Sequence, residues 1–249
     1  MSKLFSSQAK PSGKTELRLE PVDRRSFLRV AGASAAVTSG ILLTACSKES
    51  LTQTETVLPS GARIGAAVDL GSGDVGILNY AYALEQLEAA FYKMVIAMPY
   101  MGMSEMEKKY LTDIRDHEIV HRNFFKKALG SAAIPDLEVD FSAINFKDRS
   151  SVLGAARDFE DLGVAAYNGA GKYLMSPELL TIAGKIVSVE ARHASIIRYI
   201  LFPDSGAFAG DDILVPGALD RAYEPGQVLP IAQKFVKTMI TANNLPKMA

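Results

Sequence analysis

The chain of 249 residues contains one cysteine and three histidines. A single cysteine excludes an intramolecular disulfide. The apolar stretch from Val30 to Leu43 is too short to cross a bilayer, which takes roughly 20 apolar residues. No stripe of basic residues and no patch of alternating basic and aromatic residues occurs, which argues against a nucleic-acid partner.

Residues 1–45 have the order of an export signal. A basic, polar stretch ends in Arg24-Arg25-Ser26-Phe27-Leu28, the apolar stretch follows, and Leu43-Thr44-Ala45-Cys46 closes it. The arginine pair Arg24 and Arg25 resembles the signal that the twin-arginine translocase reads. The last four residues resemble a bacterial lipobox, in which the cysteine becomes the lipidated first residue. We therefore expect the twin-arginine translocase and the lipoprotein-processing machinery as partners.

A lipid on Cys46 would hold the protein at a membrane, because each buried methylene adds about 0.8 kcal/mol of membrane affinity. The expected location is the periplasm, the outer membrane or the cell surface, after export across the bacterial inner membrane. Ser47 after the lipidated cysteine favours the outer membrane under the usual Gram-negative sorting. Seven basic and three acidic residues lie up to Cys46, so the remainder, with 20 basic and 25 acidic residues, has a net charge of −5.

Residues 46–65 lack hydrophobic periodicity and are interpreted as a tether. Helical spacing of apolar residues predicts a helix from Gly76 to Met98 and a second one, capped by Ser104, to about Leu129, where Gly130 stops it. Pro135 interrupts the stretch 131–149, which we interpret as a long crossover connection.

A third helix is expected from about Ser150 to Leu174, with glycines that permit close helix contacts. Ser176 and Pro177 predict the start of a fourth helix, which runs to about Leu201. These four helices form a predicted bundle at residues 66–202. Residues 203–249 are a C-terminal extension with a short fifth helix at about 227–243.

The four main helices carry a repeated set of polar residues. Two histidines each follow a glutamate by three residues, which places carboxylate and imidazole one turn apart on one helix face. The preceding helices each carry a glutamate followed by a tyrosine seven residues later. In chain order the set is Glu85, Tyr92, Glu118, His121, Glu160, Tyr167, Glu190 and His193.

This order is similar to the ligand set of ferritin-like di-iron and di-manganese carboxylate bundles. Four carboxylates offset the charge of two divalent ions, and two imidazoles add neutral donors. We expect Glu85 and His121 to bind one ion with Glu118 bridging. By pseudo-symmetry Glu160 and His193 bind the other, with Glu190 bridging. The predicted cofactor is a pair of iron or manganese ions.

Four further residues have alternative interpretations. Tyr92 and Tyr167 are either core aromatics or groups near the centre that bond a ligand carboxylate or relay an electron. Glu88, one turn from Glu85, is either an alternative ligand or, more often for such a residue, a solvated or salt-bridged side chain. His117 has the spacing for a zinc site with His121, but the sequence shows no third ligand near it, which favours a supporting or surface role.

A family resemblance covers about residues 73–236. The stretches 73–92, 117–130, 159–170, 189–198 and 225–232 resemble the ferritin-like domain family that includes the plant desiccation-related proteins. The resemblance implies an all-α fold, a ferritin-like four-helix bundle with one long crossover connection, and a dinuclear site. It implies little about a substrate, because a fold does not determine a function.

Three functions fit these observations. The first is an oxidoreductase (a peroxidase, an oxidase or a catalase-like enzyme) that acts on peroxide or dioxygen in stress protection. The second is a ferroxidase or metal-storage protein, which the tether and the C-terminal extension fit poorly. The third is a non-catalytic desiccation or stress protein in which the metals hold the helices together. The sequence leaves the oligomeric state open, including a homo-oligomer.

Overall fold

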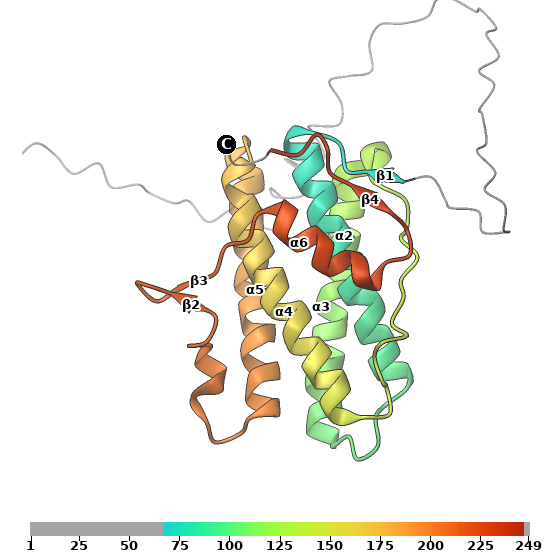
Figure 1. The fold of residues 1–249 in the computed structure, drawn as a ribbon, viewed down its shortest axis with the longest axis vertical. Coiled ribbons are helices and arrows are strands. Elements are labelled where there is room, and N and C mark those ends of the chain that lie inside the picture. The colour runs from blue at the N-terminus through green and yellow to red at the C-terminus, as the bar shows by residue number, and fades with distance from the viewer. Residues whose placement is uncertain (1–66, 247–249) are drawn as a thin grey trace, which may run out of the picture. The chain divides into compact units, whose positions relative to one another are not determined.

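A computed structural model describes residues 67–246, so the predicted signal, the tether and Cys46 lie outside the described residues. Four long helices form a bundle (Figure 1). They are α2 (Gly73–Ala97), α3 (Glu105–Leu129), α4 (Arg149–Ala170) and α5 (Pro177–Leu201). The connection from α3 to α4 runs the length of the bundle, as the sequence predicted. Among the described helices, none has the length and apolarity needed to cross a membrane.

Local signals set most of the helix ends. Ser104 caps α3 and forms a capping box with Glu107, and Gly130 ends the helix with a φ of 56°. Ser176 caps α5, where proline occupies the first helical position. Helix α2 begins at Gly73, three residues earlier than expected. Helix α4 ends at Ala170 and continues as a single 3-10 turn. The four predicted helices are thus confirmed, with small shifts at their ends.

Side-chain amides of α2 attach the crossover connection to the bundle. Asn79 donates to the carbonyls of Leu70 and Ala132 and accepts from the backbone N–H of Ile134. Gln86 accepts from the backbone N–H of Leu137. Because these backbone groups lie outside regular structure, the amides supply the hydrogen bonds that they lack. The connection is therefore held along α2.

The C-terminal extension differs from the prediction. Its helix, α6 (Pro225–Ala232), is shorter than the expected 227–243 and is followed by a 3-10 turn at 233–235. The chain then forms β4 (Ile240–Thr241), which pairs in parallel with β1 (Val68–Asp69). The side chain of Gln233 explains the ending, because it donates to the carbonyls of residues 236 and 238 and accepts from the N–H of Ile240. These bonds replace helical ones.

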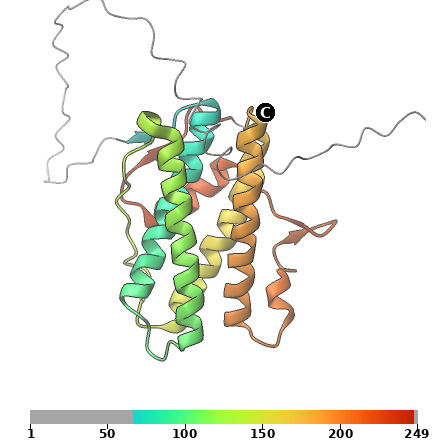
Figure 2. The same cartoon turned by 180° about the vertical axis from the view of Figure 1, so that it is seen from behind.

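Helix α6 lies across α2 and α4 (Figure 1), whereas α3 and α5 line the opposite face of the bundle (Figure 2). A small hairpin of β2 (Leu214–Val215) and β3 (Leu219–Asp220) precedes α6. Close packing at Gly169 brings the extension onto α4, since an added Cβ would lie 1.9 Å from the carbonyl oxygen of Tyr223. A side chain there would displace the backbone of the extension.

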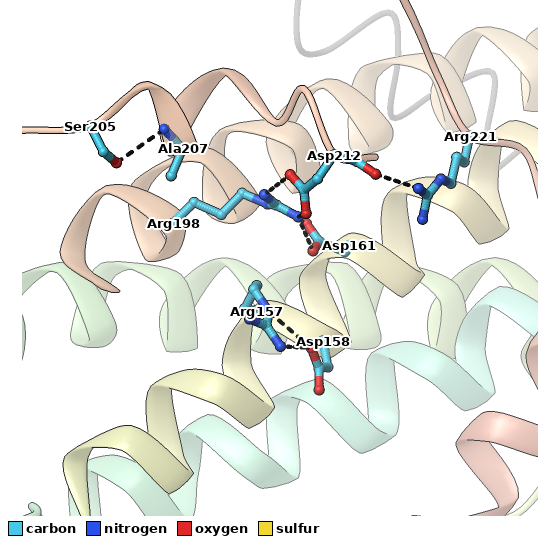
Figure 3. Close-up of polar contacts among 8 residues, drawn as sticks. All are labelled: Arg157, Asp158, Asp161, Arg198, Ser205, Ala207, Asp212 and Arg221. Atoms are coloured by element: carbon cyan, nitrogen blue, oxygen red, sulfur yellow. Dashed lines mark hydrogen bonds and ion pairs between the residues drawn. The ribbon is translucent and has the colours of Figure 1, made fainter. Parts of the chain in front are cut away.

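A charged cluster also ties the extension to the bundle (Figure 3). The guanidinium of Arg198 on α5 donates to both carboxylate oxygens of Asp161 on α4, at 2.9 and 2.6 Å. It also donates to Asp212 in the extension at 2.6 Å, and Arg221 donates to the Asp212 carbonyl. Arg198 is only 4% exposed. Its donors are used within the protein, so this cluster is structural.

Candidate metal centre

Polar side chains from all four long helices meet at the centre of the bundle. Each helix contributes one glutamate from near its middle, and these four carboxylates are 0% exposed. His193 is also buried, and the His121 side chain is 12% exposed. The structure thus brings together the six residues of the predicted ligand set: Glu85, Glu118, His121, Glu160, Glu190 and His193.

The donor atoms of these residues form two groups. In each group one atom per residue lies within 4.8 Å of the others. The first group contains Glu85 and His121, the second contains Glu160 and His193, and both contain Glu118 and Glu190. Glu118 and Glu190, the two glutamates that were expected to bridge, each contribute to both groups.

The shortest contacts run across the two halves. His121 Nδ1 lies 2.9 Å from Glu190 Oε1 but 3.8 Å from Glu118, its own partner three residues earlier. In the same way His193 Nδ1 lies 2.8 Å from Glu118 Oε1 and 3.7 Å from Glu190. Each histidine therefore faces the carboxylate on the opposite helix more closely than the one on its own helix.

Unsatisfied polar atoms mark the same place. Within the described residues, ten buried side-chain nitrogen and oxygen atoms have no hydrogen-bond partner, and eight of these belong to the six residues. They are Oε2 of Glu85 and Glu160, both oxygens of Glu118 and Glu190, and Nδ1 of His121 and His193. Buried polar groups without hydrogen bonds are costly, and the shortest contacts of the two Nδ1 atoms are with carboxylate oxygens of the same cluster. Their convergence in two groups of oxygen and nitrogen donors fits two bound cations.

The electrostatics of the carboxylates point the same way. Burial raises the pKa of Glu85 well above its usual range, and raises that of Glu160 to about 8. Burial acts in the same direction on Glu118, but close contact with His121 and His193 outweighs it and holds this pKa at about 2. Protein groups thus stabilise only part of the negative charge that four ionised glutamates would carry.

The histidines respond to the same carboxylates. Burial alone would lower the pKa of His121, but close contacts with Glu118, Glu190 and Glu85 raise it to about 12. The pKa of His193 is raised by Glu160 and Glu118 despite its burial. In the protein alone, protons on the imidazoles would supply the positive charge. A metal ion replaces such a proton and uses the same nitrogen.

Two tyrosines fix the outer oxygens of the carboxylates. The Tyr92 hydroxyl on α2 donates to Glu160 Oε1 on α4, and the Tyr167 hydroxyl on α4 donates to Glu85 Oε1 on α2, each at 2.5 Å. The other oxygen of each glutamate remains free for the centre. The structure therefore shows the bond to a carboxylate on a neighbouring helix, one of the two alternatives for these tyrosines.

His117 does not pair with His121 as a zinc site would require. Its Nδ1 lies 2.9 Å from Nε2 of His193, on the side of that ring opposite the carboxylates. The His117 residue is exposed, on α3. The sequence favoured a supporting or a surface role for His117, and the structure agrees with both, because the residue is exposed and contacts His193.

Glu88 is a fifth buried carboxylate, at 4% exposure, and the solvated or salt-bridged interpretation of it is wrong. Among the described residues it has no hydrogen-bond or ion-pair partner. Burial, and then the negative charges of Glu118 and Glu190, raise its pKa well above the usual range. An added Cβ on Gly163 of α4 would lie 3.0 Å from Glu88 Oε1. Glu88 and Gly163 occupy matching positions, three residues after Glu85 and Glu160, so the glycine leaves room for the glutamate.

A helical bundle with a buried cluster of carboxylates and imidazoles defines the ferritin-like class of proteins. A family model described as a ferritin-like domain matches residues 73–203, which include all four long helices. The chain belongs to this family. No curated relative matches the chain. The predicted fold class and the ferritin-like part of the predicted resemblance are confirmed.

Proposed function

We propose that the protein binds two iron or manganese ions and acts as an oxidoreductase on peroxide or dioxygen. The six residues of the cluster would hold the ions, Glu85 and His121 on one side, Glu160 and His193 on the other. Glu118 and Glu190 would bridge. The observation that carries the proposal is the convergence of eight buried atoms without hydrogen-bond partners into two groups.

The donor set favours this kind of metal. Carboxylate oxygens and imidazole nitrogens suit iron and manganese, and four carboxylates offset the charge of two divalent ions. Copper and zinc bind such donors more tightly by intrinsic order, so the place of loading decides which ions are bound. We further propose that the protein is exported folded through the twin-arginine pathway, which would allow loading in the cytoplasm.

When bound, two such ions would supply two electrons at one place, which with two protons reduce one hydrogen peroxide to two water molecules. Oxidation of a second hydrogen peroxide to dioxygen returns two electrons and two protons. The protein supplies a buried, water-poor surrounding. It also supplies Tyr92 and Tyr167, whose hydroxyls hold Glu160 and Glu85 in place. We propose that these tyrosines lie near the reacting oxidant as well.

A structural role for the metals is the second candidate, and the buried carboxylates favour it directly. Burial raises the pKa of Glu85, Glu88 and Glu160, which means that their ionised forms are unfavourable in the metal-free bundle. Bound cations would offset this cost. Ions that bind only the folded state would stabilise it. In that case the protein would be a non-catalytic stress protein of the desiccation-related type, and its centre would not turn over.

Elemental analysis of the purified protein, with its absorption spectrum before and after peroxide, tests the proposal. Two ions per chain and a spectral change are expected, with peroxide consumption or oxygen uptake that Glu118→Ala abolishes. Asp113→Asn is the matched control, because Asp113 is an exposed carboxylate on the same helix. Bound metal without turnover, and unfolding on chelation, would favour the structural role. A closed cage of many subunits by mass measurement would favour storage.

The location of the protein is a separate proposal. We propose that Cys46 carries a lipid and that Arg24 and Arg25 direct export, on the sequence motifs alone. Replacement of both arginines by lysine is expected to retain the protein in the cytoplasm, as cell fractionation would show. Cys46→Ser should be exported but released from the membrane fraction. A Cys46→Ser protein that stays with the membrane would contradict the lipid anchor.

A further inference from the structure

The contact between His117 and His193 joins the surface of the bundle to the buried centre. His193 turns Nδ1 toward the carboxylates of Glu118 and Glu160, at 2.8 and 3.5 Å. Its other nitrogen, Nε2, lies 2.9 Å from Nδ1 of His117. The His117 residue, on α3, is exposed, whereas His193, on α5, is buried.

The two rings meet edge to edge. Their planes differ by only 15°, and their centres are 5.1 Å apart while the nearest nitrogens are 2.9 Å apart. Rings stacked face to face would not bring one pair of nitrogens so much closer than the centres. The geometry is that of an N–H···N hydrogen bond in the plane of both imidazoles.

This hydrogen bond selects one form of His193. A nitrogen that binds a metal must carry no proton, so when Nδ1 binds, the proton of neutral His193 is on Nε2. Nε2–H then donates to Nδ1 of His117, which accepts through the lone pair of that nitrogen.

The other half of the site lacks this arrangement. His117 immediately precedes Glu118 on α3, and the matching residue before Glu190 on α5 is Val189. A valine side chain cannot hydrogen-bond, and no hydrogen bond from a described residue reaches Nε2 of His121. The two histidines that face the carboxylates therefore differ in what orients them.

We propose that His117 positions His193 for metal binding and makes the two ion positions unequal, with the ion at Glu160 and His193 bound more tightly. This inference rests on the proposed dinuclear site. A hydrogen-bond acceptor for Nε2 holds the His193 ring in the orientation that binds metal and makes Nδ1 a stronger metal ligand. Loss of such a partner typically costs roughly 10- to 100-fold in metal affinity. His117 is a positioning residue and does not bind the ion.

Titration of the metal-free, full-length protein with Co²⁺ tests the inference. Absorption would report the binding steps, and proton NMR would report the exchangeable imidazole N–H of each bound histidine. We expect two unequal binding steps. In His117→Ala the tighter step should weaken by roughly 10- to 100-fold, and one of the two N–H signals should shift and exchange faster with water. The second step and the second signal should stay unchanged.

Two further variants serve as matched controls. His117→Asn offers a carbonyl oxygen as acceptor and should restore much of the tighter step. Val189→His, a change at the matching position on α5, should strengthen the weaker step by giving His121 a partner. This second variant also keeps the test valid if His117→Ala fails to fold.

The outcomes separate this inference from the proposed function. Two ions that bind equally to the wild-type protein, or a His117→Ala variant in which neither step or both steps weaken alike, would overturn the positioning role alone. So would a Val189→His variant with both steps unchanged. A wild-type protein that binds no Co²⁺ would overturn the dinuclear site, and the positioning role with it.

Discussion

The two halves of the bundle, α2 with α3 and α4 with α5, carry the same polar groups in the same order. These groups contact each other across the two halves. A tyrosine of each half bonds the glutamate of the other, and each histidine lies closest to a carboxylate of the opposite half. Neither half therefore forms a complete binding site alone. The repeated sequence yields one shared centre instead of two independent ones.

Three of the differences between the halves involve polar or charged side chains with distinct contacts. His117 has valine as its counterpart, and Glu88 has glycine. Lys126 on α3 corresponds to Arg198 on α5, both eight residues after the bridging glutamate. Each pairs with an aspartate of the segment that follows its helix, but Lys126 does so at the surface and Arg198 is buried. The shared groups make the centre, and the differences adapt each half to its surroundings.

The largest expected effect is the difference in metal content between a variant of a glutamate that belongs to both donor groups and a variant of one that belongs to a single group. Glu118→Ala removes an oxygen from both donor groups, whereas Glu85→Ala removes one from the first group only. We expect Glu118→Ala to lose both ions and Glu85→Ala to retain about one, measured as metal per chain by elemental analysis. Equal loss in the two variants would show that the groups do not bind ions separately.

Arg198→Ala should destabilise the protein much more than Lys126→Ala. The first change leaves Asp161, whose side chain is only 15% exposed, without its partner and removes the bond to the exposed Asp212, at a cost of about 2 kcal/mol. The second removes an exposed ion pair with Asp136, and such pairs contribute little. Urea unfolding of the two variants measures the difference. A comparable loss in both would mean that burial of the pair is unimportant.

The metal-free protein should lose stability as pH rises from about 5 to 8. The pKa of Glu160 is raised to about 8 in the folded protein, and that of Glu85 is raised too, so the folded state binds more protons than the unfolded state over this interval. The raised pKa of His121 acts in the same direction above its usual value. We expect the melting temperature to fall by roughly 5 °C.

The metal-bound protein is the control for this pH dependence. Ions at the donor atoms replace protons there, so the melting temperature should vary less between pH 5 and 8. A metal-free protein that becomes more stable toward pH 8 would contradict the raised pKa of the buried carboxylates. Calorimetry of both forms in the same buffers makes the comparison.

The smallest expected effect concerns Gly154 and Gly163, the two glycines of α4 that flank Glu160 in the sequence. Gly154→Ala meets no atom within 4 Å and should stabilise the helix by up to about 1 kcal/mol. Gly163→Ala would place Cβ 3.0 Å from Glu88 Oε1 and should fail to give this gain. Adding Glu88→Ala to Gly163→Ala tests the cause, because it removes the close contact. If Gly163→Ala alone stabilises as Gly154→Ala does, the Glu88 carboxylate moves aside freely.

Much of the fold could be predicted because its signals are local. Ser104 with Glu107, Gly130, and Ser176 with Pro177 act within one helical turn, so the ends of α3 and the start of α5 followed from short stretches of sequence. The C-terminal helix was predicted too long because Gln233 bonds residues beyond the helix, and helical spacing does not reveal such bonds. The pairing of β1 with β4 joins residues about 170 positions apart.

The sequence by itself determined which residues form the candidate centre, because a spacing of three on a helix places Glu118 with His121 and Glu190 with His193 whatever the surroundings. Only the tertiary structure decided how these pairs combine. Helix packing turned each histidine toward the glutamate of the opposite helix, buried Glu88 against Gly163, and joined His117 to His193. Those contacts depend on distances between helices, which residue spacing within a helix does not set.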